Sequence, residues 1–197
     1  MIDLQEYLEN KLRDIICSWN AEDIYAISFF VYANDSIEYR GCSNVTEFFV
    51  SYNTENDCQG ADEFSEERWN YAFWRQKETP IFEASDECPD MKILFDWYEE
   101  NGIDRIGYED VKACYDNEMR YIGKGPIGLY ELLSEITSVA LRLEESGFIK
   151  TQFGRPIPII IHDLEYSWHM IDATRKANAN GEADAFFFTM KSLGFTE

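Results

Sequence analysis

The sequence predicts a single α+β domain over residues 1–197, with helices packed on one face of a mainly antiparallel sheet. Apolar, β-branched segments cluster early in the chain and are joined by short connections, whereas segments with helical apolar periodicity dominate later. The chain has 197 residues, 45% of them hydrophobic, which is enough to form one core without disulfides. No repeat or linker divides it, so we expect one domain.

The first elements follow from the spacing of apolar residues. Residues 3–19 carry apolar side chains every three or four positions and are predicted to form a helix. Residues 24–32 are almost continuously apolar, which is typical of a central strand. A turn at residues 34–35 should lead into a return strand at 37–43, and a third strand is predicted at 48–52.

An aromatic segment follows at residues 65–76. Four large rings lie within six residues, namely Trp69, Tyr71, Phe73 and Trp74. Ser65 as N-cap, followed by two glutamates, predicts a helix. So much ring surface predicts burial in the core. The alternative is a surface on which Asn70, Arg75 and an exposed Trp contact a partner, because Trp and Arg are enriched in binding hot spots.

Helical periodicity dominates the rest of the chain. The predicted helices span residues 89–100, 109–119, 127–146, 168–178 and 183–193. One β-branched segment, residues 156–161, interrupts them and is predicted to be a strand. Proline has no backbone N–H to donate, so the two prolines indicate that this strand lies at a sheet edge or that they occupy its first residues.

The charge is the most informative feature for function. The net charge is −21, and residues 83–118 hold twelve acidic side chains against three basic ones. Such an excess repels nucleic acid and anionic membranes and accelerates encounter with a basic protein. Acids that frame aromatic rings suit a docking surface, and a solvated face is the alternative. The expected binding residues are Trp69, Asn70, Arg75, Trp97, Tyr98, Glu99, Glu100, Tyr108, Asp110 and Tyr115.

The cysteines and the N-terminus indicate a compartment. Five cysteines are widely spaced and form no Cys-x-x-Cys pair, so we expect neither a zinc site nor a disulfide framework. The chain starts without the basic and apolar segments of a signal peptide. It contains no stretch that approaches the roughly 20 apolar residues needed to span a membrane. We therefore expect a cytoplasmic protein without cofactor or metal.

One polar cluster suggests an enzyme as the alternative. His162, Asp163 and Glu165 follow a predicted strand, and His169 lies a little further on. If these four side chains converged, they could form a metal site or a histidine base oriented by a carboxylate. The spacing matches no stringent ligand pattern, and Asp163 could instead cap the next helix. This hypothesis predicts a small hydrolase or a metal-dependent enzyme.

The order of features resembles a known family. The residues that carry the resemblance are the strand at 24–28, the segment Tyr52-Asn53-Thr54-Glu55, the aromatic segment at 67–74 and the strand end at His162-Asp163. Together they resemble the uncharacterised bacterial proteins grouped as domain of unknown function 4303, and the resemblance covers most of the chain. By analogy with immunity proteins of bacterial toxin systems, it implies a small acidic binding protein that neutralises a basic toxin domain, with no catalytic residue.

Overall fold

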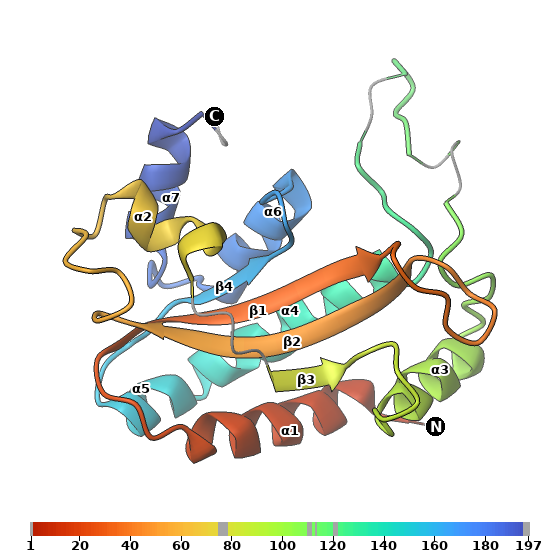
Figure 1. Cartoon of the computed structure of the whole chain (residues 1–197), viewed down its shortest axis with the longest axis horizontal. Coiled ribbons are helices and arrows are strands. Elements are labelled where there is room, and N and C mark those ends of the chain that lie inside the picture. Colours follow the sequence, from red (N-terminus) through yellow and green to blue (C-terminus); the bar gives the residue numbers. More distant parts are fainter. Residues whose placement is uncertain (1, 75–78, 110–111, 113, 120–121, 195–197) are drawn as a thin grey trace.

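The sheet is four-stranded and mostly antiparallel, as the sequence predicts. The computed structural model describes residues 2–74, 79–109, 112, 114–119 and 122–194 (Figure 1). The strands are β1 (Ile24–Asn34), β2 (Val45–Thr54), β3 (Thr79–Phe82) and β4 (Ile159–His162). In the order β3-β2-β1-β4, β2 pairs antiparallel with both β1 and β3, whereas β4 pairs parallel with β1. The fold is a single compact α+β domain.

The main core lies between the sheet and the long helices. The helices are α1 (Leu4–Ser18), α2 (Glu66–Trp69), the 3-10 helix η1 (Tyr71–Phe73), α3 (Met91–Glu100), α4 (Leu129–Glu145), α5 (Phe148–Phe153), α6 (Trp168–Ala177) and α7 (Asp184–Ser192). Alternate residues of β1, including Phe29, are buried with the apolar stripes of α1 and α4, represented by Leu8 and Ile136. α1, α4 and α5 therefore lie on one face of the sheet (Figure 1).

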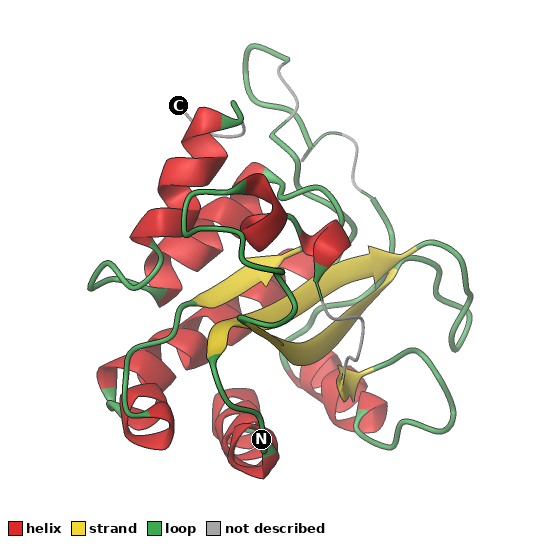
Figure 2. Cartoon of the chain, turned by 60° about the vertical axis from the view of Figure 1, so that its left-hand side comes forward, coloured by secondary structure: helices red, strands yellow, loops and turns green. Residues whose placement is uncertain are grey.

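A second, smaller apolar cluster covers part of the opposite face. Ala26 and Ile160 of the strands pack there with Trp69 of α2 and with Phe186 and Met190 of α7. Figure 2 shows helices on both sides of the sheet. The expectation that helices pack on one face thus holds for the long helices and needs correction for the short ones. The aromatic segment supplies much of this cover.

The outer edge of β4 is sealed by side chains of α6. The hydroxyl of Thr174 accepts the N–H of Ile161 at 2.9 Å and donates to its carbonyl at 2.9 Å. The amide of Asn178 makes the same pair of bonds with Ile159, at 3.0 and 2.7 Å. These bonds replace a neighbouring strand, so β4 is an edge strand whose edge is covered.

One predicted strand does not form, and another is longer than predicted. Residues 37–43 form no strand and contain only an isolated bridge between Tyr39 and Cys42. Arg40, Gly41 and Asn44 have positive φ angles, which an extended strand cannot accommodate. The partner of β1 is instead β2, which includes the predicted strand at 48–52. β3 and the short helix α5 are elements that the sequence analysis did not predict.

The predicted helix at 65–76 is interrupted at Asn70. This residue has an extended backbone, and its side-chain oxygen accepts the N–H of Ala72 at 3.0 Å. It therefore ends α2 and caps η1, because Asn competes for backbone donors. The predicted helix at 109–119 is also wrong where the chain is described: residues 114–119 are turns and extended backbone, with Met119 at a φ of 61°. Arg75, Gln76, Asp110, Val111 and Ala113 lie outside the described residues.

No helix within the described ranges is long and apolar enough to cross a membrane.

Candidate binding site

Three of the expected binding residues are buried, and their assignment to a binding surface is wrong. Trp69 belongs to the second cluster and donates its Nε1–H to the carbonyl of Glu63 at 2.7 Å. Trp97 and Tyr98 belong to the main core. Tyr98 donates its hydroxyl to the carbonyl of Gly128 at 3.0 Å, and burial raises its pKa. These rings stabilise the fold and are not available to a partner.

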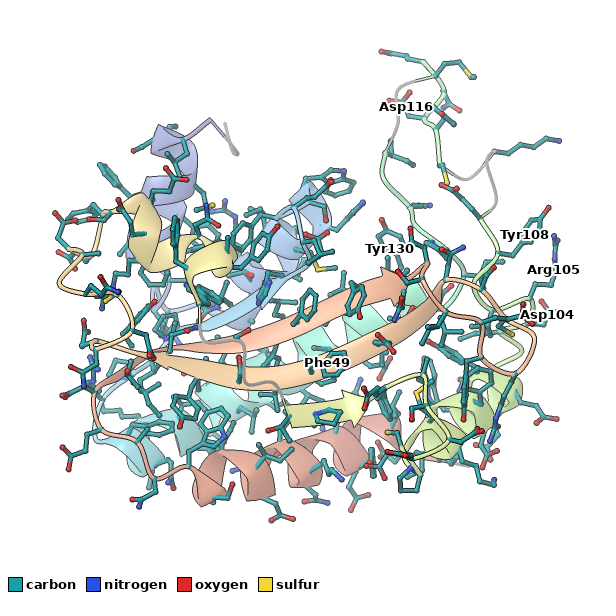
Figure 3. The ribbon with its side chains drawn as sticks, in the orientation of Figure 1. Phe49, Asp104, Arg105, Tyr108, Asp116 and Tyr130 are labelled. Atoms are coloured by element: carbon teal, nitrogen blue, oxygen red, sulfur yellow. The ribbon has the colours of Figure 1, made fainter. Side chains whose placement is uncertain are left out.

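The other expected binding residues that are described lie at or near the surface. Glu99 and Glu100 are exposed at the end of α3, and Tyr108 and Tyr115 are 55% and 38% exposed. Asn70 is half-buried because it caps η1, and Arg75 and Asp110 lie outside the described residues. The described residues among 104–119, which we call the arm, rise away from the sheet in Figure 3, with Tyr108 near the base and Asp116 near the tip. The expected residues at the surface are thus spread over α3, this arm and the junction of α2 and η1, where Asn70 lines a pocket.

His162 is enclosed by aromatic rings on the second face of the sheet. Its ring is stacked between Phe30 and Tyr71, at centroid distances of 5.2 and 5.9 Å, and Trp74 packs edge-on at 5.2 Å. Burial lowers the pKa of His162 to about 4, so the imidazole is neutral near pH 7. Nδ1 lies 3.0 Å from the carbonyl of Asp163, which can only accept, so Nδ1 carries the proton.

The neutral imidazole is paired with a serine that the sequence analysis missed. With its proton on Nδ1, His162 accepts the Ser28 hydroxyl through Nε2 at 2.7 Å. A general base would hold a nucleophile in this way. Both side chains are nevertheless buried, at 3% and 4% exposure, and Ser28 lies within β1 between β2 and β4. Backbone amides there are used in the sheet, so an oxyanion would lack donors.

The polar cluster predicted around the two histidines does not form. His169 lies on α6, half-buried, and packs against Tyr130 of α4 at 4.6 Å. A groove of about 340 Å³ between α4 and α6 contains it, and burial lowers its pKa. Among the described residues, no group of three or more His, Cys, Asp or Glu side chains is arranged to hold a metal ion. The two histidines therefore do not share a site.

Asp163 and Glu165 line a different site, which we call the acidic pocket. It has a volume of about 460 Å³ and lies where the carboxyl ends of the parallel strands β1 and β4 meet. Its lining includes Tyr32 and Asp35 at the end of β1. The loop after β4 contributes Asp163, Leu164 and Glu165. No described Lys or Arg forms an ion pair with these three carboxylates. Their charge is uncompensated within the described structure.

A second pocket, which we call the apolar pocket, adjoins the first. It has a volume of about 520 Å³, and Tyr71, Tyr166, Met190 and Leu193 are among its lining residues. Leu164 and Glu165 line both pockets and form a ridge between them. Leu164 is 53% exposed although it is apolar. An exposed apolar side chain between two hollows is typical of a contact surface.

A column of stacked rings connects the two pockets. Tyr32 of the acidic pocket stacks on Phe30 at 4.5 Å, Phe30 stacks on His162, and His162 stacks on Tyr71 of the apolar pocket. Phe49 of β2 packs beside this column, 6.2 Å from Phe30. The buried histidine thus has a clear structural role, because it holds the walls of both pockets in fixed positions.

The hydrogen bonds of the ridge fix its backbone. Asp163 accepts the N–H of Glu165 at 2.9 Å and that of Ser167 at 3.2 Å through Oδ1. The alternative role of Asp163, capping the start of the next helix, is close to this arrangement, although Ser167 is the N-cap itself. Tyr166 has a φ of 51° and donates its hydroxyl to the carbonyl of Trp69. The ridge is therefore pre-organised.

Sequence reasoning found part of this site. It selected Asp163 and Glu165 as members of a histidine–carboxylate cluster, and Asn70, which lines the apolar pocket, but it did not select Tyr32, Asp35 or Leu164. A signal for these residues existed, because turn residues follow an apolar strand at 34–35 and a leucine interrupts a polar run. Only the parallel pairing of β1 with β4 brings them together, and no local pattern predicts that pairing.

Comparison with protein-family models, with curated proteins and with solved structures finds no match for this chain.

Proposed function

We propose that the protein is a non-enzymatic binding protein of the cytoplasm that docks on a basic protein, as an immunity protein does on a basic bacterial toxin domain. The observation that carries the proposal is uncompensated acidic charge around exposed aromatic and apolar side chains. The chain has a net charge of −21, and the carboxylates of the acidic pocket have no ion-pair partner in the described residues. Such a surface attracts a cationic partner and repels phosphate groups.

Exposed rings would supply the affinity that charge alone does not. Tyr108 and Tyr115 are exposed on the arm, where Arg105 lies over the ring of Tyr108 at 3.9 Å, and Leu164 is exposed between the pockets. Electrostatic attraction mainly raises the association rate, whereas buried aromatic and apolar anchors determine how long a complex lasts. We therefore expect tight binding that weakens, without disappearing, as salt rises.

The test is binding of a basic toxin domain encoded beside this protein. Its affinity should exceed that of an unrelated basic protein of equal charge by about a hundredfold or more, ~2.7 kcal/mol, because only the cognate protein fills the apolar contacts. Calorimetry at two salt concentrations measures the two affinities and their dependence on salt. Equal affinities for the two basic proteins would refute specific recognition and leave only non-specific attraction.

A small hydrolase is the second candidate, and the Ser28–His162 hydrogen bond is the observation that favours it. Burial of both side chains and the paired backbone at Ser28 weigh against it. Any turnover detected in a broad substrate screen should disappear in both Ser28→Ala and His162→Ala if this candidate is correct. Activity that survives both substitutions would eliminate it.

A further inference from the structure

We propose that one contiguous segment of the partner occupies both pockets, with an arginine side chain in the acidic pocket and a large apolar side chain in the apolar pocket. This inference rests on the proposed function, in which the partner is a basic protein. It adds the chemistry of the element that is recognised and the place where it binds.

The acidic pocket requires a cation of a particular shape. Asp35 approaches from the turn after β1, whereas Asp163 and Glu165 approach from the loop after β4, so the charges line more than one wall. No lysine, arginine or histidine is among its described lining residues. A planar guanidinium with several donors satisfies separated carboxylates better than a compact ammonium does.

The apolar pocket suits a large hydrophobic side chain. Six of the eight residues that line its volume of about 520 Å³ are tyrosine or apolar, and the other two are Asn70 and Glu165, so it can take an aromatic or long aliphatic group. Met190 can adjust to an imperfect shape because its side chain is flexible and polarisable. Leu164 on the ridge would lose solvent contact when the pocket fills. The occupant is therefore apolar on this side of the ridge.

Both side chains come from one segment because the pockets share a wall. Leu164 and Glu165 belong to both linings, so the two occupants lie on either side of two consecutive residues. The hydrogen bonds of Asp163 and the hydroxyl of Tyr166 hold that wall in place. A rigid ridge between two pockets lowers the entropy cost of binding and fixes the spacing of the two side chains.

Charge complementarity selects a basic protein over the other possible occupants. A second copy of this chain would bring another net charge of −21 to an acidic surface and would be repelled. A nucleic acid would be repelled for the same reason. A segment with an arginine beside a bulky apolar residue supplies both missing components.

The experiment uses the full chain and short synthetic peptides that contain one arginine and one tryptophan at varied spacing. Charge-matched peptides with alanine in place of tryptophan serve as probes of the acidic pocket alone. The pocket variant is Asp35→Lys with Glu165→Lys. Its matched control is Asp14→Lys with Glu145→Lys, which changes the net charge equally at exposed positions outside both pockets. Leu164→Ser tests the ridge, and calorimetry measures each affinity.

The pocket variant should bind the best peptide about tenfold or more weakly, whereas the control should lose less than about twofold. Leu164→Ser should remove the preference for tryptophan over alanine peptides. Equal losses in the pocket variant and the control would overturn the inference, because only long-range charge would then act. Concentration-dependent dimerisation that the pocket variant abolishes would also overturn it, since a second copy would be the occupant.

The same variants separate this inference from the proposed function. If a cognate basic protein binds the wild type and the pocket variant equally well, the pockets are refuted and the proposed function stands. If peptides bind with the expected pocket dependence but no cognate basic protein binds better than a charge-matched one, the proposed function fails and the chemistry of the pockets stands.

Discussion

Thr174→Val should destabilise the protein by removing the seal on the edge of β4. The Thr174 hydroxyl both accepts from and donates to the backbone of Ile161, and both residues are buried. Valine keeps the shape of the side chain but has no polar atom, so the N–H and the carbonyl of Ile161 lose their partners. The change therefore isolates the hydrogen bonds from the packing.

The expected magnitude follows from the burial of the two backbone groups. A buried donor or acceptor without a partner costs roughly 1–3 kcal/mol, so the two groups together should cost about 2–6 kcal/mol, centred on about 4 kcal/mol. This is a large share of the roughly 5–15 kcal/mol by which a domain is stable. For a domain of this size, 1 kcal/mol shifts the Tm by roughly 2–4 °C, so a cost of about 4 kcal/mol should lower the Tm by about 8–16 °C.

Urea unfolding and thermal unfolding measure the effect. Thr174→Ser keeps the hydroxyl and loses one methyl group, so it should cost only about 1 kcal/mol. Ser138→Ala deletes a hydroxyl that donates to the carbonyl of Ser134 on the exposed side of α4, and it should be nearly neutral. If Thr174→Val were as mild as Ser138→Ala, the view that α6 replaces a neighbouring strand would be refuted.

Three further changes test other parts of the structure. Stability should fall by roughly 3 kcal/mol as pH drops from about 6.5 to about 4, because the unfolded chain then protonates His162 and the buried ring does not; urea unfolding of wild type and His162→Gln across this range checks it. Burial raises the pKa of Glu144 to about 8, and the negative charge of Glu182 contributes less to the same shift. Stability should therefore fall as pH rises from about 4.5 to about 8, because the unfolded chain loses this proton first. Glu144→Gln should remove that decline. At neutral pH it should raise the free energy of unfolding by about 1 kcal/mol, given the partial exposure of Glu144, and the Tm with it. Arg68→Lys should cost about 1 kcal/mol by removing two 2.7 Å bonds to Glu55, and a double-mutant cycle with Glu55→Gln measures the coupling.

Elements with a sustained apolar period could be predicted from sequence. α1 and α4 carry an apolar residue every three or four positions over several turns, and β1 is apolar almost throughout. Such patterns depend on neighbours in the chain, so they are confirmed with boundaries within about two residues. β4 is an edge strand, as one of the two alternatives for its prolines predicts, but it begins at Ile159 and not at the predicted residue 156, so both prolines precede it.

Segments whose outcome depends on a single backbone conformation could not be predicted. Residues 37–43 alternate like a strand, but positive φ angles at Arg40 and Gly41 make them a turn. The aromatic segment is rich in helix signals, but Asn70 ends the helix by bonding to the backbone of Ala72. In each case one local preference overrides a weak periodic pattern, which propensity alone does not reveal.

The binding site depends on contacts that are distant in the sequence. Asp35 and Asp163 lie in separate parts of the chain and meet only because β4 pairs parallel with β1. The sequence identifies acidic side chains but not which of them lack a cationic neighbour. It likewise suggested a catalytic role for His162, whereas the packed rings around it indicate a structural one.

The seal on β4 also explains why a four-residue strand can position two pockets. β4 has few ladder bonds, and its register against β1 places Ile161 opposite Phe29 in the main core and His162 opposite Phe30 in the ring column. A slip by one residue would exchange these faces and move the imidazole into the apolar core. The bonds from Thr174 and Asn178 each engage one defined residue of β4, so they hold the register from the outer side. With that register fixed, His162 stays in the column and the ridge that begins at Asp163 stays between the pockets. α6 therefore stabilises the sheet and the geometry of the proposed site through the same contacts.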